Sequence, residues 1–346
     1  IAQIDADKCV DCGLCQKRCP QNQVIGKNAP KKVLAVRLKD EDVLYRSASG
    51  GAFAGIAKAW IEDGGIVAGV TYDGEWNAHH VFATTLEELK AIQSSKYVQA
   101  DTRQTFSEVK RLLTEGKKVL FSGTACQIGG LKAFLKKDYD NLLTMDLICH
   151  GVSSPLLFRK YTEWLGDKCG SPIKEYDFRD KKGGWGLGYK YKYKYGACSI
   201  DPYYSRFLAG DTYREACYQC KYCTPERVGD ITIGDYWGIE KEHPKFFSTK
   251  GVSCVLINTD KGINAWNSSA SLFYTLESEF DKAARHNGNL LHPTVRKNDV
   301  RDRIYIGINE ENWFADKFAD SFRPSLVAKV KNLMPMWVRL SIKKIQ

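Results

Sequence analysis

Four closely spaced cysteines near the start of the chain constrain its structure more than any other feature. They are Cys9, Cys12, Cys15 and Cys19, and Pro20 follows the last of them. The resulting run, C-x2-C-x2-C-x3-C-P, is the spacing with which bacterial ferredoxins ligate a 4Fe–4S cluster. Three thiolates on one tight loop can hold three irons of a cube, and Gly13 lets the backbone wrap closely. A zinc site needs only two cysteine pairs, so the triple spacing favours iron and sulfide.

The fourth cysteine of this motif leaves two alternatives open. In two-cluster ferredoxins the fourth cysteine ligates the other cluster, whereas this chain contains one complete motif. Cys19 therefore either closes a single cluster or belongs with a motif upstream of Ile1. In both cases residues 1–30 are expected to form a small ferredoxin-like 4Fe–4S module, in which the polar stretch 21–30 is a linker.

The composition indicates the cellular setting. The chain has twelve cysteines in 346 residues, and six of them occur in C-x-x-C units. In a reducing compartment such clustering indicates metal binding rather than disulfides, so we expect a cytoplasmic protein. The net charge is +10, but Lys and Arg are dispersed and no nucleic-acid motif accompanies them, so nucleic acid is not an expected partner. No apolar run reaches the roughly 18 residues of a membrane span.

Residues 31–322 alternate short apolar runs with amphipathic segments. The expected buried strands are 67–72, 119–122 and 143–148. The expected helices are 52–63, 86–93 and 106–115. This alternation predicts an α/β body with a mostly parallel or mixed sheet and covering helices. Within 186–205, tyrosines alternate with Lys and Gly, which predicts one half-exposed antiparallel strand.

A second set of cysteines is scattered along the body. Cys126 and Cys149 each come just after a predicted strand, at the sheet edge where open α/β proteins bind ligands. Cys217, Cys220 and Cys223 form a C-x2-C-x2-C triple. Two strand-end cysteines and one C-x-x-C pair would make a four-thiolate site. Equally, Cys126 and Cys149 could be small buried apolar residues.

Three loops have the composition of a cofactor site. Ser47–Gly51 immediately precedes a predicted helix, and small residues at a helix N-terminus favour a phosphate. Ser94–Tyr97 offers hydroxyls, a cation and an aromatic face. The short strand 231–233 ends in the turn Gly234-Asp235-Tyr236-Trp237, on which a planar ring could pack. Turn glycines and a core tryptophan are the alternative explanation of these loops.

The last segment, 323–346, contains six basic residues and no acidic one. Its apolar residues recur at near-helical spacing: Leu326, Val327, Val330, Leu333, Trp337, Leu340 and Ile342. The pattern predicts a basic amphipathic helix. It fits a peripheral membrane contact or a partner surface, but docking on the body is the interpretation that we favour.

Together these motifs resemble the coenzyme F420 hydrogenase/dehydrogenase beta-subunit family. The similar stretches are SASGGAF (47–53), SSKYVQA (94–100), VLFSGTACQIGGLK (119–132), DLICHGVSSP (146–155), FRDKKGGWG (178–186), REACYQCKY (214–222), RVGDITIGDYWGI (227–239) and the weaker GVSCVLINTDKG (251–262). They occur in the family's order over residues 1–300. Bacterial members of this type often accompany polysaccharide-biosynthesis genes.

The resemblance implies an iron–sulfur flavoprotein with FAD in the α/β body and one or two 4Fe–4S clusters. The implied flavin-site residues are Ser49, Gly50, Gly51, Ser95, Lys96, Thr124, Gly234 and Asp235. The implied body-cluster ligands are Cys126, Cys149, Cys217 and Cys220, which leaves Cys223 over. Lys96 is also the expected catalytic residue.

The implied function is electron transfer between clusters, fed by ferredoxin or another carrier protein, and a flavin that acts on a small-molecule substrate. A non-catalytic electron-transfer subunit is the alternative, and a zinc-stabilised binding module is a third hypothesis.

Overall fold

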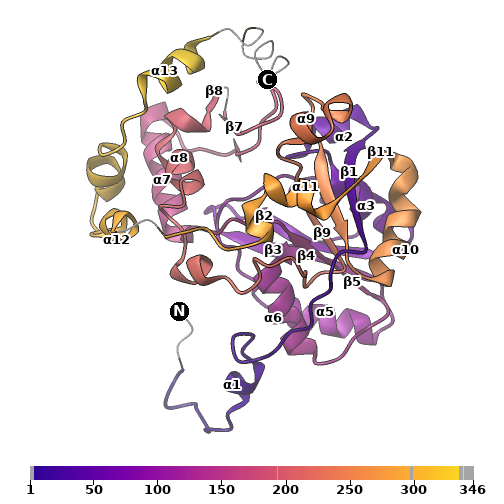
Figure 1. The fold of residues 1–346 in the computed structure, drawn as a ribbon. Coiled ribbons are helices and arrows are strands. Elements are labelled where there is room, and N and C mark those ends of the chain that lie inside the picture. The colour runs from indigo at the N-terminus through magenta and orange to yellow at the C-terminus, as the bar shows by residue number, and fades with distance from the viewer. Residues whose placement is uncertain (1–3, 193, 297–298, 335–337, 339–346) are drawn as a thin grey trace.

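A mixed sheet of eight strands forms the centre of the protein. The computed structural model describes residues 4–192, 194–296, 299–334 and 338. The strands lie in the order β11-β1-β10-β9-β5-β4-β2-β3 (Figure 1). Their bounds are β1 Lys32–Leu38, β2 Ile66–Tyr72, β3 Ala78–Ala83, β4 Val119–Thr124, β5 Leu142–Leu147, β9 Ile231–Asp235, β10 Ser253–Ile257 and β11 Phe273–Ser278.

Parallel pairing is confined to the middle of this sheet. The pairs β2–β4, β4–β5 and β5–β9 are parallel. The outer pairs on both sides are antiparallel. The parallel strands β4 and β5 are buried along almost their whole length, as strands covered on both faces must be. The predicted α/β fold with a mostly parallel or mixed sheet is confirmed, and the sheet is of the mixed kind.

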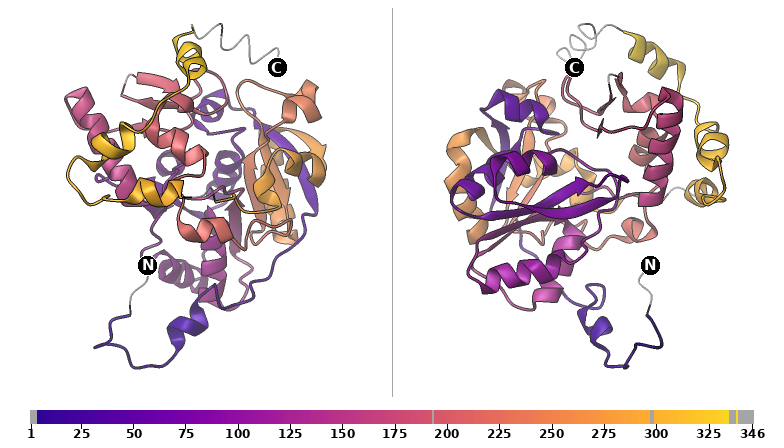
Figure 2. Two further views of the ribbon diagram at one scale, coloured as in Figure 1. Left: turned by 60° about the vertical axis from the view of Figure 1, so that its left-hand side comes forward. Right: turned by 180° about the vertical axis from the view of Figure 1, so that it is seen from behind.

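Helices cover both faces of the sheet (Figure 2). On one face the core contains residues of α2 Glu41–Arg46, α3 Ala52–Glu62, α4 Leu86–Ile92 and α10 Asp260–Ser269. On the other face it contains residues of α5 Thr105–Thr114, α6 Ala125–Leu135, α9 Ile239–Glu242 and α11 Phe280–Arg285. Neighbouring residues of β1 divide between the faces, because Leu34 belongs to the first core and Val33 to the second, as a pleated strand requires. The three strands and three helices expected between residues 52 and 148 lie within two residues of the observed bounds.

A second, aromatic core lies beside the sheet. It contains residues of α7 Pro155–Cys169, of α8 Pro202–Leu208 and of a small sheet. That sheet consists of β6 Tyr176–Asp177, β7 Gly188–Tyr191 and β8 Lys194–Ala197. The prediction of one strand over 186–205 was wrong in this respect, because the chain turns at Lys192, where φ is +48°, and returns as β8. Tyr189 and Tyr191 are buried and Tyr195 is exposed, so the strands are half-exposed as expected; Tyr193 lies outside the described residues.

The two ends of the described chain lie outside the eight-stranded sheet. At the N-terminal end, α1 Leu14–Arg18 belongs to a small module that protrudes beyond α6 (Figure 1). At the other end, α12 Val300–Tyr305, a π-helical turn at 314–319 and α13 Leu326–Leu333 follow one another. The turn packs on α7 and α8, whereas Trp337, Leu340 and Ile342 lie outside the described residues. None of the helices described is both long and apolar enough to cross a membrane.

Candidate functional site

Three neighbouring parallel strands end at one edge of the sheet and bring chemically active residues together. The strands are β4, β5 and β9, which are adjacent and parallel. Cys126 lies in the first turn of α6, which starts directly after β4. Cys149 follows β5, and Asp235 is the last residue of β9. Ligands bind at this edge of open α/β sheets, because loops and helix N-termini converge there.

Five thiols meet at this edge. They are Cys126, Cys149, Cys217, Cys220 and Cys223. The ionisation of Cys149 responds to Cys126, Cys217 and Cys220, and that of Cys223 responds to Cys149 and Cys220. The sulfur of Cys223 lies 3.9 Å from the backbone oxygen of Cys149. The structure thus brings the four expected cysteines together and adds Cys223 to them.

Burial and crowding oppose the ionisation of most of these thiols. Burial first, and then the neighbouring thiols, raise the pKa of Cys149, and burial also raises the pKa of Cys126 and of Cys217. Cys220 differs, because a hydrogen bond from Cys223 lowers its pKa to about 6 although burial opposes this. A positively charged metal core lets coordinating thiols ionise. The chemistry of this donor set therefore fits an iron–sulfur cluster.

The hydroxyl group of Thr124 lies among these thiols. The Thr124 hydroxyl lies 3.1 Å from the sulfur of Cys126 and 3.1 Å from Oε1 of Gln127. Thr124, expected at the flavin, thus hydrogen-bonds within the cysteine group.

In the described part of the chain, no three His, Cys, Asp or Glu side chains are arranged so that they could hold a single metal ion. None of the twelve cysteines, all of them described, forms a disulfide.

A buried ion pair forms a second group at the same edge. The carboxylate of Asp235 accepts two hydrogen bonds of 2.7 Å from the Arg179 guanidinium and one of 2.8 Å from the Trp185 indole. The Arg179 side chain is 1% exposed and that of Asp235 is 14% exposed. Burial alone would raise the pKa of Asp235, but the charge and hydrogen bonds of Arg179 outweigh it and hold the pKa below its usual value. Asp235 is thus ionised and fixed in orientation.

Residues 178–186 connect the three loops that the sequence marked as flavin-like. Arg179 donates to the Tyr97 hydroxyl at 3.1 Å as well as to Asp235. Lys181 donates to the backbone oxygen of Ser49 at 2.6 Å, and burial lowers its pKa to about 7. The Ser47–Gly51, Ser94–Tyr97 and Gly234–Trp237 loops therefore meet on one segment.

Two tryptophans form a flat aromatic surface beside this ion pair. The rings of Trp185 and Trp237 stack with centroids 5.1 Å apart and planes within 3°. The guanidinium of Arg179 lies 5.5 Å from the centre of the Trp237 ring. A planar cofactor could pack against such a surface, because aromatic rings favour offset stacking.

The expected flavin-site glycines are closely packed against protein. A side-chain carbon at Gly50 would lie 2.2 Å from the backbone oxygen of Val36, and one at Gly234 would lie 2.8 Å from the side chain of Ile148. Gly51 has a φ of +80° and directly precedes α3. Glycine at 50 is therefore explained by the close backbone of Val36, glycine at 234 by the close Ile148 side chain, and glycine at 51 by its left-handed conformation.

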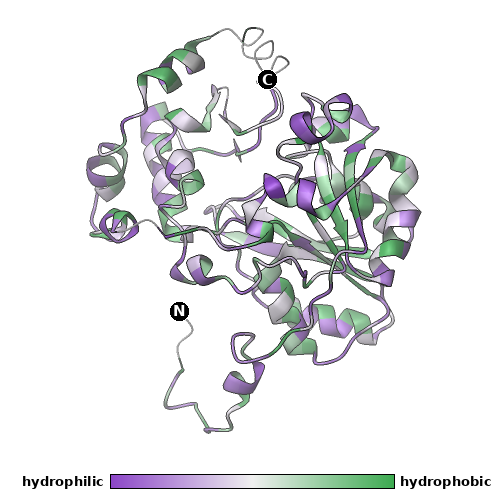
Figure 3. Cartoon of the chain, in the orientation of Figure 1, coloured by the Kyte–Doolittle hydropathy of each residue, from purple (hydrophilic) through white to green (hydrophobic). Residues whose placement is uncertain are grey.

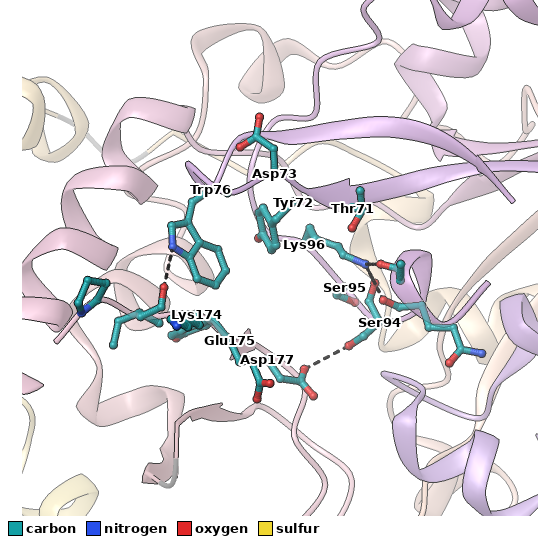
Figure 4. A pocket seen from close by; sticks show the side chains of 16 residues that line it. Thr71, Tyr72, Asp73, Trp76, Ser94, Ser95, Lys96, Lys174, Glu175 and Asp177 are labelled. Atoms are coloured by element: carbon teal, nitrogen blue, oxygen red, sulfur yellow. Dashed lines mark hydrogen bonds between the residues drawn. The ribbon is translucent and has the colours of Figure 1, made fainter. Parts of the chain in front are cut away.

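Lys96 borders a cavity of about 660 Å³ (Figure 4). Ser95 also lines this cavity, together with Tyr72 and Trp76. The ammonium group of Lys96 donates to the backbone oxygens of Gln93 at 2.5 Å and Ala91 at 3.3 Å, at the end of α4. Burial lowers the pKa of Lys96 to about 8. Lys96 thus caps the C-terminal end of α4. Its ammonium group loses a proton more readily than that of an ordinary lysine.

Consecutive residues join the cysteine group and the ion-pair group. Cys149 belongs to the first, while the charges of Asp235 and Arg179 act on His150, whose pKa is lowered mainly by burial. Cys149 and Asp235 also lie at the ends of the neighbouring parallel strands β5 and β9, so the two groups share one edge of the sheet.

The N-terminal module contacts the same region from outside. Lys221 donates to the backbone oxygen of Pro20, and Lys27 donates to the Thr224 hydroxyl at 3.0 Å. Burial raises the pKa of Tyr222 to about 12, and Cys126, Cys220 and Cys19 add to this rise. Tyr222 thus lies between the N-terminal motif and the second group of thiols.

Arg179, Lys181 and Trp185 received no role from the sequence, although their stretch contributed to the family resemblance. Tyr222 was passed over in the same way, and its position between Cys220 and Cys223 was the available signal. The available signal for Arg179, Lys181 and Trp185 was the concentration of charged and aromatic residues among glycines in 178–186.

Two profiles of one protein family match the body of the chain. Residues 33–105 match the N-terminal domain of the coenzyme F420 hydrogenase/dehydrogenase beta subunit. Residues 116–280 match the C-terminal domain of the same coenzyme F420 hydrogenase/dehydrogenase protein. The chain belongs to this beta-subunit family. Residues 2–24 of this family member match a 4Fe-4S binding domain, so its N-terminal module is of the iron–sulfur kind.

A solved structure shares the fold of this beta-subunit family member. It is a chain of the F420-reducing NiFe hydrogenase complex from Methanosarcina barkeri, with 17% sequence identity and a TM-score of 0.52. The match covers 83% of this chain and 98% of the other. Among curated proteins no sequence matches significantly. The family and its 4Fe–4S domain make this chain an iron–sulfur protein of an oxidoreductase family.

Proposed function

We propose that the chain is an iron–sulfur flavoprotein oxidoreductase that exchanges electrons between 4Fe–4S clusters and FAD for the two-electron conversion of a small molecule. The observation that carries this proposal is that Cys126, Cys149 and Asp235 lie at the ends of the adjacent parallel strands β4, β5 and β9. A one-electron site and a two-electron site must lie close together for efficient exchange, and residues at the ends of neighbouring strands meet this requirement.

The proposed cluster ligands are the thiols already named. Cys9, Cys12, Cys15 and Cys19 would hold one cluster in the N-terminal module. Cys126, Cys149, Cys217 and Cys220 would hold the second, with Cys223 as a neighbouring thiol that donates a hydrogen bond to Cys220. Such clusters supply one-electron transfer. The chain contributes a partly buried position for Cys149, Cys217 and Cys220 and a hydrogen bond between the Thr124 hydroxyl and Cys126.

The proposed flavin site lies on the segment 178–186. FAD supplies the exchange between one-electron and two-electron chemistry. The tryptophan pair offers a flat surface, the N-terminus of α3 beyond Ser49–Gly51 favours a phosphate, and Arg179 is a buried cation held by Asp235. Lys96, next to Ser95 on the cavity wall, is the proposed proton donor, since a pKa near 8 leaves it protonated at neutral pH.

Anaerobic measurement of iron, sulfide and flavin per chain tests the proposal. We expect two 4Fe–4S equivalents and one FAD, and turnover of a candidate substrate with reduced ferredoxin. Cys12→Ser and Cys149→Ser should each remove one cluster, and not the same one. A colourless protein without iron or flavin would contradict the proposal and would favour the zinc hypothesis if zinc were found instead.

A second candidate function is a non-catalytic electron-transfer subunit of a larger redox complex. The fold match to a chain of a hydrogenase complex favours it. Partner subunits, rather than ferredoxin, would then exchange electrons with the clusters. Flavin bound at full occupancy, without turnover unless partner subunits are added, distinguishes this candidate from a self-sufficient enzyme. For both candidates we propose a cytoplasmic location and no nucleic-acid partner.

A further inference from the structure

The last described helix turns its apolar side chains toward the solvent. Leu326, Val327, Val330 and Leu333 of α13 are 77%, 63%, 47% and 82% exposed. Their spacing of one, four and seven residues puts them on one face of the helix. No other helix in the described residues has more than one large apolar side chain with such exposure, and single ones are normal for a protein surface. Four on one short helix form a patch that calls for a partner.

The opposite face of the helix attaches it to the body. Ala328 is buried, and Oδ1 of Asn332 accepts a hydrogen bond of 3.2 Å from the backbone N–H of Ala197 at the end of β8. Ser325 caps the helix by accepting from the N–H of Ala328 at 3.1 Å. Packing thus fixes the orientation of α13, and the small side chains of the attached face leave the larger apolar ones outside. Docking on the body, which the sequence favoured, accounts for one face only.

The charge of the segment indicates what covers the other face. Residues 323–346 contain six Lys and Arg and no Asp or Glu. Lys329 is exposed on α13 itself, next to Val330. A lysine beside an apolar stripe can rest its methylenes on the apolar layer while its ammonium reaches anionic headgroups. An apolar face combined with excess basic charge is typical of helices that lie in a membrane interface.

The position of α13 in the molecule leaves this face accessible. All three views show α13 at the rim of the molecule, on the side of the aromatic core and away from the eight-stranded sheet (Figures 1 and 2). Figure 3 shows it as a predominantly hydrophobic helix at that rim. A flat surface could therefore contact α13 without covering the edge where the cysteines meet.

We propose that α13 binds the surface of an anionic lipid bilayer, with its apolar face at the boundary of the acyl chains and Lys329 among the headgroups. The contact is peripheral and reversible, and it holds the oxidoreductase body at the membrane. It is independent of the cofactors proposed above.

Co-sedimentation of the full chain with vesicles tests this proposal. The vesicles contain phosphatidylcholine alone or phosphatidylcholine with phosphatidylglycerol. We expect binding to the anionic vesicles that weakens with added salt. The affinity of the triple variant Leu326→Gln/Val330→Gln/Leu333→Gln for the vesicles should fall at least about tenfold. The three apolar side chains that would transfer from water into the bilayer, and so favour binding, are replaced by polar ones. Lys329→Gln should weaken binding about fivefold.

Matched controls distinguish this contact from nonspecific adsorption of exposed apolar side chains and from misfolding. Val295→Gln removes another highly exposed aliphatic side chain and should leave binding unchanged. All variants should keep wild-type iron content and an unchanged far-ultraviolet circular dichroism spectrum, because the altered side chains are exposed.

Three results would overturn the proposal: no binding of the wild type to anionic vesicles, equal binding by the triple variant, or binding that is the same on purely zwitterionic vesicles. A dimer in lipid-free buffer that the triple variant abolishes would also overturn it, because a second copy would then be the occupant of the face.

Discussion

Replacing Asp235 with Asn tests the ion pair at the centre of the candidate flavin site. The variant keeps the size of the side chain and an oxygen that can accept from Trp185, but it leaves the Arg179 guanidinium buried without a counter-charge. Breaking a buried pair by removing one partner costs about 3–5 kcal/mol. Because the amide oxygen still accepts one hydrogen bond, we expect the free energy of unfolding to fall by about 3 kcal/mol, the lower end of that range.

Anaerobic urea denaturation followed by tryptophan fluorescence measures this loss. The stacked Trp185 and Trp237 report directly on the site. The urea midpoint should fall while the slope of the transition stays unchanged, since the surface exposed on unfolding is the same. Flavin content measured on the same samples shows whether the charge is also needed for cofactor retention.

A double variant sharpens the test. Arg179→Met/Asp235→Leu replaces the pair by apolar side chains and should be more stable than Asp235→Asn, because no uncompensated charge remains. It should still lose flavin if Arg179 contacts the cofactor. An Asp235→Asn protein whose unfolding free energy lies within about 0.5 kcal/mol of wild type would refute the reasoning, since that is the range of ordinary surface substitutions.

Three further predictions address other parts of the chain. Cys12→Ser should lower iron and sulfide by one 4Fe–4S equivalent and leave flavin in place, and an unchanged iron content would rule out the N-terminal ligand assignment. Lys96→Ala should weaken flavin retention or shift the flavin potential without abolishing cooperative unfolding; if neither changes, capping of α4 is its whole role. His80 is buried, and burial lowers its pKa from 6.5 to about 4. As the pH falls, the unfolded chain therefore binds a proton at this histidine before the folded chain does. The free energy of unfolding is highest above pH 6.5 and falls by about 3 kcal/mol as the pH drops to 4. His80→Phe should remove this pH dependence, and urea midpoints at the two pH values would show if it persists.

The parallel strands β4 and β5 at the middle of the sheet could be predicted from the sequence because they are buried on both faces. Runs such as Val119–Ser122 and Leu143–Ile148 contain few polar side chains, and only a covered strand accounts for them. The amphipathic helices between them were equally clear. The same reasoning put Cys126 and Cys149 at the end of adjacent strands, since chain order and parallel pairing fix that edge.

What the sequence could not supply depends on contacts between distant segments. Arg179 and Asp235 are separated by 56 residues, and nothing local indicates that they pair. The addition of β1, β10 and β11 as an antiparallel flank is of the same kind. The hairpin at Lys192 was hidden because alternating tyrosines continue through the turn without a Gly or Pro to mark it.

The linker of the N-terminal module has a consequence for exchanging parts between proteins. Backbone atoms of Asn28 pair in both directions with those of Arg227, at 2.8 Å each, just beyond the Cys217–Cys223 triple. The Arg227 side chain is buried and donates to the backbone oxygens of Tyr222 and Leu147. A chimera that imports a foreign ferredoxin module should therefore import residues 217–227 with it. A module joined only at residue 30 would lack the segment 217–227, with which the backbone of its linker pairs.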